Sequence, residues 1–171
     1  VAKHLNIREC SLDRVRAPVA RRVVDDDDFE RKIARGQERA ERLERELAAN
    51  EAYRAAAASW KGSLAFSLQP DGTPGFPASR GLFLDLAHGN CRAARPALPG
   101  DLESATFCLS APAAVWLRLT SGALEPGVAL MGGGLKLTRG SLFSLLPHLK
   151  AAQALLHCAR LVPTHLPASG I

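Results

Sequence analysis

The sequence contains few aromatic residues and no long apolar run. Aromatic side chains make up 5% of the 171 residues, so alanine and leucine must supply most of the core volume. No uninterrupted apolar run approaches the roughly 18 residues that cross a membrane. The first 22 residues carry arginine throughout and lack the apolar segment of a secretory signal. These absences lead us to expect a cytoplasmic protein.

The motifs of common enzyme classes are also absent. The sequence has no G-x-S-x-G elbow, no phosphate-binding loop and no G-x-G-x-x-G between a strand and a helix. His88 follows Asp85 closely, but no nucleophile accompanies the pair. We therefore expect no catalysis, no metal and no cofactor. The four cysteines stand far apart and at no zinc spacing: Cys10, Cys91, Cys108 and Cys158.

The composition that remains is that of a globular protein with a basic excess. Hydrophobic residues make up 47% of the chain and charged residues 23%, and the net charge is +5. Residues 61–171 hold nine Lys or Arg against five Asp or Glu, whereas residues 1–60 hold thirteen against twelve. A basic surface favours anionic partners such as lipid. No nucleic-acid recognition motif accompanies the charge, so we expect no nucleic acid partner.

The N-terminal part predicts an arm followed by a long helix. Residues 1–24 are basic and irregular, and the acids of residues 25–28 suit the start of a helix, so residues 1–28 form an arm and a cap. Residues 29–49 are strongly helical, and their charged residues are typical of a solvated face. A narrow apolar stripe also permits a short coiled coil and a homodimer through residues 29–49. The stripe consists of Ile33, Ala40, Leu43 and Leu47.

Beyond residue 50 the patterns become those of a mixed domain. Alternating apolar residues between glycine and proline signals predict strands. The first four strands, which look like an antiparallel meander, are expected over residues 63–68, 81–86, 91–97 and 104–110, and a fifth over residues 135–139. Helices are expected over residues 51–59, 113–119, 126–131 and 142–160, and Pro147 should kink or break the last of them.

This order of elements predicts an α+β fold. We expect a five-stranded, mainly antiparallel sheet that helices cover on one face, preceded by the N-terminal helix. The domain would span residues 29–160, and residues 161–171, with two prolines, would form a C-terminal tail.

Three stretches of this domain, in this order and at these spacings, point to one family. Residues 50–62 look like its passage from a helix to the first strand, residues 114–122 like its tryptophan–glycine helix, and residues 124–137 like its short helix and last strand. The chain thus resembles the sterol carrier protein 2 family, in its bacterial type, over about residues 30–160. The resemblance implies an apolar tunnel between sheet and helices that holds a sterol, a fatty acid, an acyl-CoA or another lipid.

A lipid carrier needs apolar walls more than catalytic groups, because each buried methylene contributes about 0.8 kcal/mol. Taken singly, each candidate is more often an ordinary core residue. At the mouth, Arg118, Lys136 and Arg139 could meet a carboxylate or phosphate head group, or be solvated surface. The ligand-binding candidates are Phe66, Leu84, Phe107, Trp116, Leu119, Met131, Leu137, Phe143, Leu146 and Leu149.

Two functional hypotheses follow. In the first, the protein is a carrier that binds and transfers a hydrophobic ligand, and a large continuous cavity would favour it. In the second, it is a non-catalytic interaction module on the same fold, with a filled cavity and with the stripe of residues 29–49 exposed for a partner. Under the first, the basic arm would touch anionic membrane surfaces transiently through Arg14, Arg16, Arg21 and Arg22.

Overall fold

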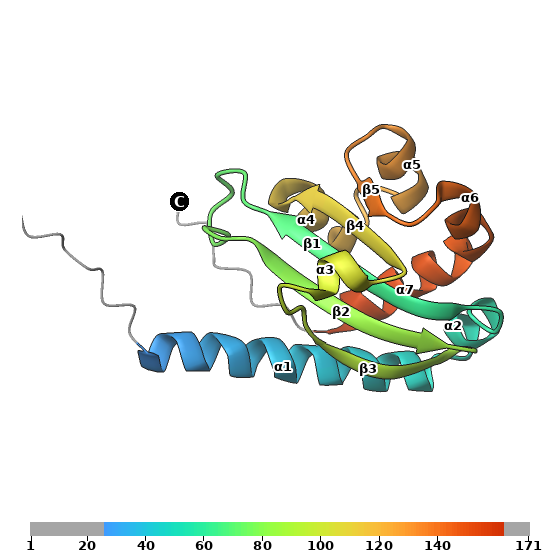
Figure 1. Ribbon diagram of the computed structural model, residues 1–171, viewed down its shortest axis with the longest axis horizontal. Coiled ribbons are helices and arrows are strands. Elements are labelled where there is room, and N and C mark those ends of the chain that lie inside the picture. Colours follow the sequence, from blue (N-terminus) through green and yellow to red (C-terminus); the bar gives the residue numbers. More distant parts are fainter. Residues whose placement is uncertain (1–25, 163–171) are drawn as a thin grey trace, which may run out of the picture.

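The computed structural model describes residues 26–162, with side chains from Glu30 onward (Figure 1). The predicted arm of residues 1–24 and nearly all of the predicted tail lie outside the described residues. The strands are β1 (Lys61–Gln69), β2 (Arg80–Ala87), β3 (Asn90–Pro96), β4 (Phe107–Pro112) and β5 (Lys136–Arg139). The helices are α1 (Asp26–Ala49), α2 (Glu51–Ala56), α3 (Asp101–Ser104), α4 (Ala113–Ser121), α5 (Pro126–Met131), α6 (Leu142–Leu145) and α7 (Leu149–Leu161), with a 3-10 turn, η1, at Leu146–His148.

The five strands form one mixed sheet in the order β3-β2-β1-β4-β5. β1, β2 and β3 make the expected antiparallel meander, and β5 lies antiparallel to β4. β4 instead runs parallel to β1, with Leu64 beside Phe107, so the prediction that all four first strands form a meander is wrong. Because β3 and β4 point the same way, the chain must cross over the sheet between them, and α3 lies on that crossover.

One face of the sheet carries the main core. Every second side chain of a strand points to this face, where helices cover it. Leu64 of β1 and Leu84 of β2, which pair with each other, are examples, and each is at most 1% exposed. At the start of β1, the ring of Trp60 packs edge-on to Phe107, with centroids 5.7 Å apart. The expected α+β sheet with helices on one face is confirmed in outline.

A smaller cluster occupies the other face, where α3 lies. Ala65 and Cys108 of the sheet and Ala105 beside α3 are all buried there. The short α3 was not predictable from periodicity because four residues make barely one turn. Its presence delays the start of β4 to Phe107, three residues after the expected start of that strand.

The long helix α1 runs along β3, and its first turns extend past the sheet (Figure 1). It begins at Asp26, so the acids of residues 26–28 stand in its first turn rather than before it. Three residues of the predicted stripe, Ala40, Leu43 and Leu47, are at most 4% exposed, and Ile33 alone remains exposed. The alternative in which this stripe is left exposed for a partner does not hold for Ala40, Leu43 and Leu47, because the chain covers them itself.

The last helical segment is broken where proline predicts it. Pro147 lies in η1, between α6 and α7, because proline cannot donate the backbone hydrogen bond that a continuous helix needs there. α7 then packs along α1, α2 and α4 on the core face of the sheet. Among the described helices, none combines the length and the apolar character that a membrane span requires.

Candidate functional site

An apolar pocket of about 300 Å³ opens between α1, α4, the end of α7 and the neighbouring parts of β1 and β2. Its rim includes Gly36, Arg39, Arg80, Gly81 and Thr120. The volume is at the lower end of the range of small-molecule sites. The apolar walls are formed by Ala40, Leu43, Phe66, Leu68, Leu82, Trp116, Ala159 and Val162.

The floor of the pocket follows from strand alternation. Phe66 and Leu68 are two residues apart on β1, and Leu82 of β2 pairs with Phe66, so all three point to the same face. Trp116 of α4 packs edge-on to Phe66, with ring centroids 5.4 Å apart. Its indole Nε1 donates a hydrogen bond to the Ser67 carbonyl at 3.0 Å. This bond fixes the indole over the strand and leaves its apolar surface to the pocket.

Helix α1 supplies the opposite wall with small residues. A Cβ added to Gly36 would lie 3.2 Å from Cγ of Pro96, so the helix approaches the end of β3 closely at this position. One turn further, Ala40 is 1% exposed, and Leu43 closes the inner end of the wall. The small residues at positions 36 and 40 therefore let α1 lie close to the sheet, and both line the pocket.

The polar groups at the rim suit an anionic head group. Arg39 and Arg80 line the pocket, and no aspartate or glutamate does. The guanidinium of Arg80 also lies 5.6 Å from the ring centroid of Phe76. The hydroxyl of Thr120 donates to the Trp116 carbonyl at 2.9 Å, so its oxygen can still accept. Two cations beside an apolar pocket can bind the carboxylate or phosphate of an amphiphile.

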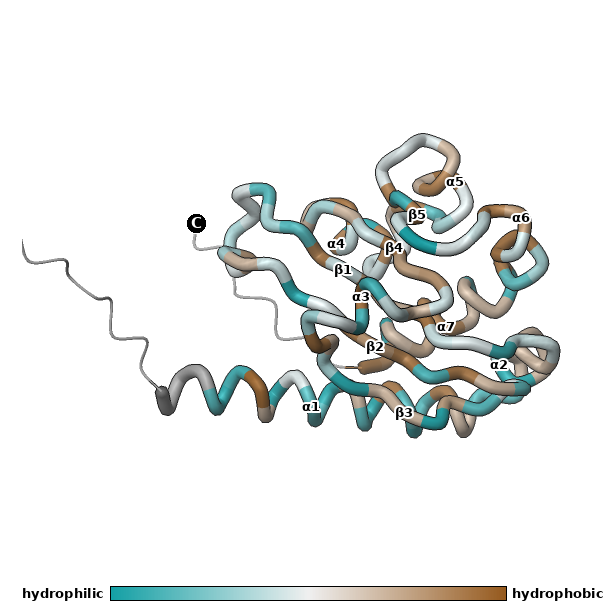
Figure 2. The backbone as a smooth tube through the Cα atoms, viewed as in Figure 1, coloured by the Kyte–Doolittle hydropathy of each residue, from teal (hydrophilic) through white to brown (hydrophobic). Residues whose placement is uncertain are grey.

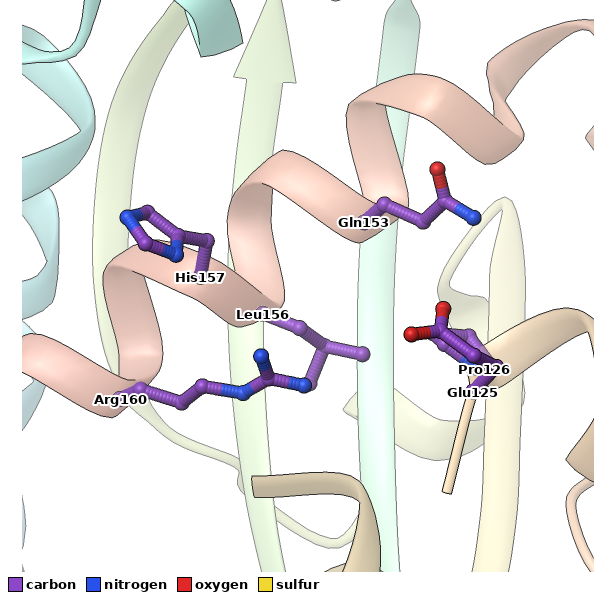
Figure 3. A pocket seen from close by; sticks show the side chains of 6 residues that line it. All are labelled: Glu125, Pro126, Gln153, Leu156, His157 and Arg160. Atoms are coloured by element: carbon purple, nitrogen blue, oxygen red, sulfur yellow. The ribbon is translucent and has the colours of Figure 1, made fainter. Parts of the chain in front are cut away.

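A second pocket, of about 270 Å³, is polar and lies on the other side of α7 (Figure 3). Gln153, His157 and Arg160 of α7 line it together with Glu125, which stands just before α5, and Figure 3 shows the His157 ring turned away from Glu125. The Arg160 guanidinium donates to the Leu119 carbonyl at 3.0 Å and so caps the C-terminal end of α4. This pocket therefore lies where a structural contact joins α4 to α7, and it has too little apolar wall for a lipid tail.

The structure does not bring the ten predicted ligand-binding residues together. Phe66 and Trp116 line the apolar pocket. The others lie in the core or on the surface: Leu84, Phe107 and Leu119 are buried, Leu137 and Leu149 are half-buried, and Met131, Phe143 and Leu146 are exposed. The cations proposed for the mouth, Arg118, Lys136 and Arg139, do not line this pocket. Those that do, Arg39 and Arg80, carry no signal in the sequence that separates them from other surface arginines.

The buried thiols and the buried phenol are poor reactive groups. Burial raises the pKa of the Cys91 thiol to about 12 and also raises the pKa of Cys158. Burial likewise raises the pKa of Tyr53, whose hydroxyl is enclosed without a hydrogen-bond partner. Because a cysteine reacts as its thiolate, Cys91 and Cys158 serve as core residues rather than nucleophiles.

Comparison with known proteins identifies the family. The sequence model of the SCP-2 sterol transfer family matches residues 40–141, more than half of the chain. The chain belongs to the SCP-2 sterol transfer family. The resemblance that residues 50–62, 114–122 and 124–137 indicate is thereby confirmed. A comparison with curated proteins finds no significant match.

Two solved structures of this family's type are similar over nearly their whole length. A crystal structure of sterol carrier protein 2 shares 40% identity, covers 74% of this chain and 97% of its own, and has a TM-score of 0.67. The solution structure of a conserved hypothetical protein, possibly a sterol carrier protein, from Thermus thermophilus shares 41% identity. It covers 78% of this chain and 91% of its own, with a TM-score of 0.66.

Proposed function

We propose that this member of the SCP-2 sterol transfer family binds a single-chain anionic amphiphile, such as a long-chain fatty acid, in the apolar pocket and carries it between membranes. The observation on which the proposal rests is the composition of the pocket. Its walls are aliphatic and aromatic, and its charged rim residues are both arginines. The tail would lie against Phe66 and Trp116, and the carboxylate would lie between Arg39 and Arg80.

The free energies of the two kinds of contact favour this arrangement, in which the apolar walls bind the tail and the two arginines bind the carboxylate. Each tail methylene that leaves water contributes about 0.8 kcal/mol, so the walls supply affinity without any specific contact. A carboxylate bound by two guanidinium groups gains charge-assisted hydrogen bonds and fixes the orientation of the ligand. A sterol has no anionic group that the two arginines of the pocket could bind.

The alternative, an interaction module with a filled cavity, is supported less well. It requires a packed interior and an exposed stripe on the N-terminal helix. The structure has a pocket beside that helix, and the stripe residues Ala40, Leu43 and Leu47 are buried within the chain. A homodimer through residues 29–49 would therefore have to use the charged face of α1. The arm's contact with an anionic membrane stays a prediction, which deletion of residues 1–24 and vesicle co-sedimentation would test.

The test is a direct binding measurement with matched ligands. Native mass spectrometry of the purified protein, followed by organic extraction, would show which lipid co-purifies. Displacement of a fluorescent fatty acid by palmitate and by the uncharged hexadecanol would then be compared. We expect Arg39→Ala and Arg80→Ala each to weaken palmitate binding by about tenfold and to leave hexadecanol binding unchanged.

Arg45→Ala is the control, because Arg45 is exposed on the same helix and does not line the pocket. Equal effects of Arg45→Ala and Arg39→Ala would show that overall charge, rather than the rim, attracts the ligand. Failure of palmitate and hexadecanol alike to displace the probe would contradict the proposal as a whole.

A further inference from the structure

An apolar surface that belongs to neither pocket lies on α5 and α6. Met131 and Phe143 are each 85% exposed, and Val128 is 59% exposed. Leu142 of α6 and Leu146, which begins the following turn η1, are exposed as well. These five residues are called the α5–α6 patch below. Soluble proteins seldom expose several large apolar side chains at one corner, and such a patch marks a contact with a protein or a membrane.

The fold presents both helices at the same corner of the molecule. Figure 1 shows α5 and α6 in the same part of the molecule, next to β5, and Figure 2 shows apolar residues along both. Ten residues separate Met131 from Leu142, and among them Leu137 of β5 pairs with Leu109 of the sheet. The sheet thus anchors the segment. Ala129 of α5 and Leu145 of α6 are buried, whereas the residues of the patch are turned to solvent.

The chain segment that carries the patch has basic side chains and no acidic ones. Residues 126–150 include Lys136, Arg139 and Lys150, all exposed, and no aspartate or glutamate. Nε of Arg139 donates to the Ala105 carbonyl at 2.8 Å, which ties this β5 side chain to the segment between α3 and β4. The nearest acid along the chain is Glu125, which lines the polar pocket beside α7 (Figure 3). Exposed apolar side chains flanked by cations match the boundary of an anionic bilayer, where tails and negative head groups meet.

We propose that the α5–α6 patch docks the protein onto an anionic lipid surface. Met131 and Phe143 enter the bilayer among the lipid chains, and Lys136, Arg139 and Lys150 contact the head groups. A second copy of the chain fits this surface less well, because a two-fold contact would bring the cations of both copies to one interface, and the segment of residues 126–150 has no acid to pair with them. The side chains project rather than line a groove, which suits a deformable medium better than a fixed protein surface.

This inference rests on the proposed function in one respect: docking is useful to a carrier, because a carrier must reach the membrane that holds its cargo. The docking itself requires no cargo. The patch also contains Met131, Phe143 and Leu146, which sequence reasoning assigned to the wall of a tunnel. Their exposure indicates that these side chains serve the surface of the molecule instead of a closed cavity.

The test is co-sedimentation of the full chain with vesicles that contain no fatty acid. The vesicles consist of phosphatidylcholine alone or of phosphatidylcholine with phosphatidylglycerol. We expect the parent protein to bind the anionic vesicles, to bind the neutral vesicles at least tenfold more weakly, and to be released by about 0.5 M salt. The double variant Met131→Ser, Phe143→Ser should bind the anionic vesicles about tenfold or more weakly than the parent.

Leu98→Ser is the matched control, because Leu98 is 61% exposed but lies before α3, on another part of the molecule. It should bind like the parent. Lys136→Glu, which reverses a charge and removes no apolar surface, should also weaken binding to the anionic vesicles by about tenfold. Because every substituted side chain is exposed, the variants should keep the circular dichroism spectrum of the parent.

Three results would overturn the proposal. The first is a parent protein that binds neither vesicle or binds both alike. The second is a double variant that sediments like the parent. The third is a dimer of the parent in analytical ultracentrifugation that the double variant lacks, which would assign the patch to self-association. Palmitate binding without vesicles is measured alongside. Met131→Ser, Phe143→Ser should keep it, whereas Arg39→Ala should weaken it by about tenfold and still dock, so the two proposals can fail separately.

Discussion

Asp101 is the single charged residue among residues 30–162 that is buried. Its carboxylate accepts hydrogen bonds from both terminal nitrogens of the Arg95 guanidinium, one of them at 2.9 Å, and from the Leu98 backbone N–H at 2.6 Å. The same guanidinium lies 4.5 Å from the ring centroid of Phe83. These contacts fix the crossover and α3 on the outer face of the sheet. The hydrogen bonds from Arg95 hold the pKa of Asp101 below its ordinary value, because they favour the charged carboxylate.

This pKa shift predicts a loss of stability in acid that depends on one residue. Because the pKa of Asp101 is lower in the folded chain, the unfolded chain takes up the proton first as the pH falls. The stabilisation is therefore complete above the ordinary carboxyl pKa of about 4 and is lost as the pH falls through the lower, folded value. In urea unfolding near neutral pH, Asp101→Asn should lower the free energy of unfolding by about 2 kcal/mol. It should also reduce the further loss of stability on acidification.

Glu103→Gln provides the comparison for this prediction. Glu103 belongs to the same short helix but is exposed, and it forms no ion pair with another described residue. We expect its substitution to change neither the stability near neutral pH nor the acid dependence. If Glu103→Gln and Asp101→Asn gave the same pH profile, the acid dependence would come from general charge and not from the contact with Arg95.

At the scale of the elements, local sequence patterns predicted where the strands and helices lie, but not the direction in which each strand pairs with its neighbour. Alternation and glycine or proline signals located all five strands, and Pro147 located the break between α6 and α7. The direction of β4 could not be predicted in this way, because an alternating strand has the same pattern whether its neighbour runs parallel or antiparallel. Its direction depends on the crossover that contains α3, a helix too short for periodicity to reveal.

The long helix α1 shows the same limit of prediction from a local pattern. The spacing of its apolar residues predicted a stripe, and the stripe exists. Spacing alone does not distinguish a stripe that a partner covers from one that the chain covers, since both exclude water from the same side chains. In the structure, β3 lies along the helix and Leu43 is 4% exposed.

Two substitutions on α1 follow from this packing. Leu43→Ala removes a buried side chain between helix and sheet and should lower the free energy of unfolding by about 2–5 kcal/mol. Ile33→Ala, on the same helix, should change it by less than about 0.5 kcal/mol, because Ile33 is 46% exposed. Urea unfolding of both variants measures the difference. Equal losses would mean that the outer turns of α1 are buried in solution, for example in a dimer through this helix.

At the scale of the whole molecule, the pocket is assembled from residues far apart in the chain. Its walls run from Gly36 to Val162, and its two arginines, Arg39 and Arg80, lie on α1 and β2. Phe66 and Trp116 were predictable because they are large apolar residues of a strand and a helix. The arginines were not, because only the placement of α1 beside the sheet brings Arg39 to the same pocket as Arg80.

Because the pocket joins α1, the sheet, α4 and α7, a ligand within it should stabilise the entire fold. A ligand that binds only the folded chain adds about 2.7 kcal/mol at a concentration one hundred times its Kd. For a protein of this size, that gain corresponds to a rise in Tm of roughly 5–10 °C. Calorimetry with saturated fatty acids below their micellar concentrations measures this rise.

The dependence on chain length distinguishes binding in the pocket from binding at the surface. At one fixed concentration, we expect the rise in Tm to increase from octanoate to palmitate, because each further methylene enters the apolar walls. Arg39→Ala should reduce the rise at every chain length by a similar amount, since the carboxylate contact does not depend on the tail. Met131→Ser, Phe143→Ser should leave it unchanged. A rise that this double variant abolished would place the fatty acid on the α5–α6 patch and not in the pocket beside α1.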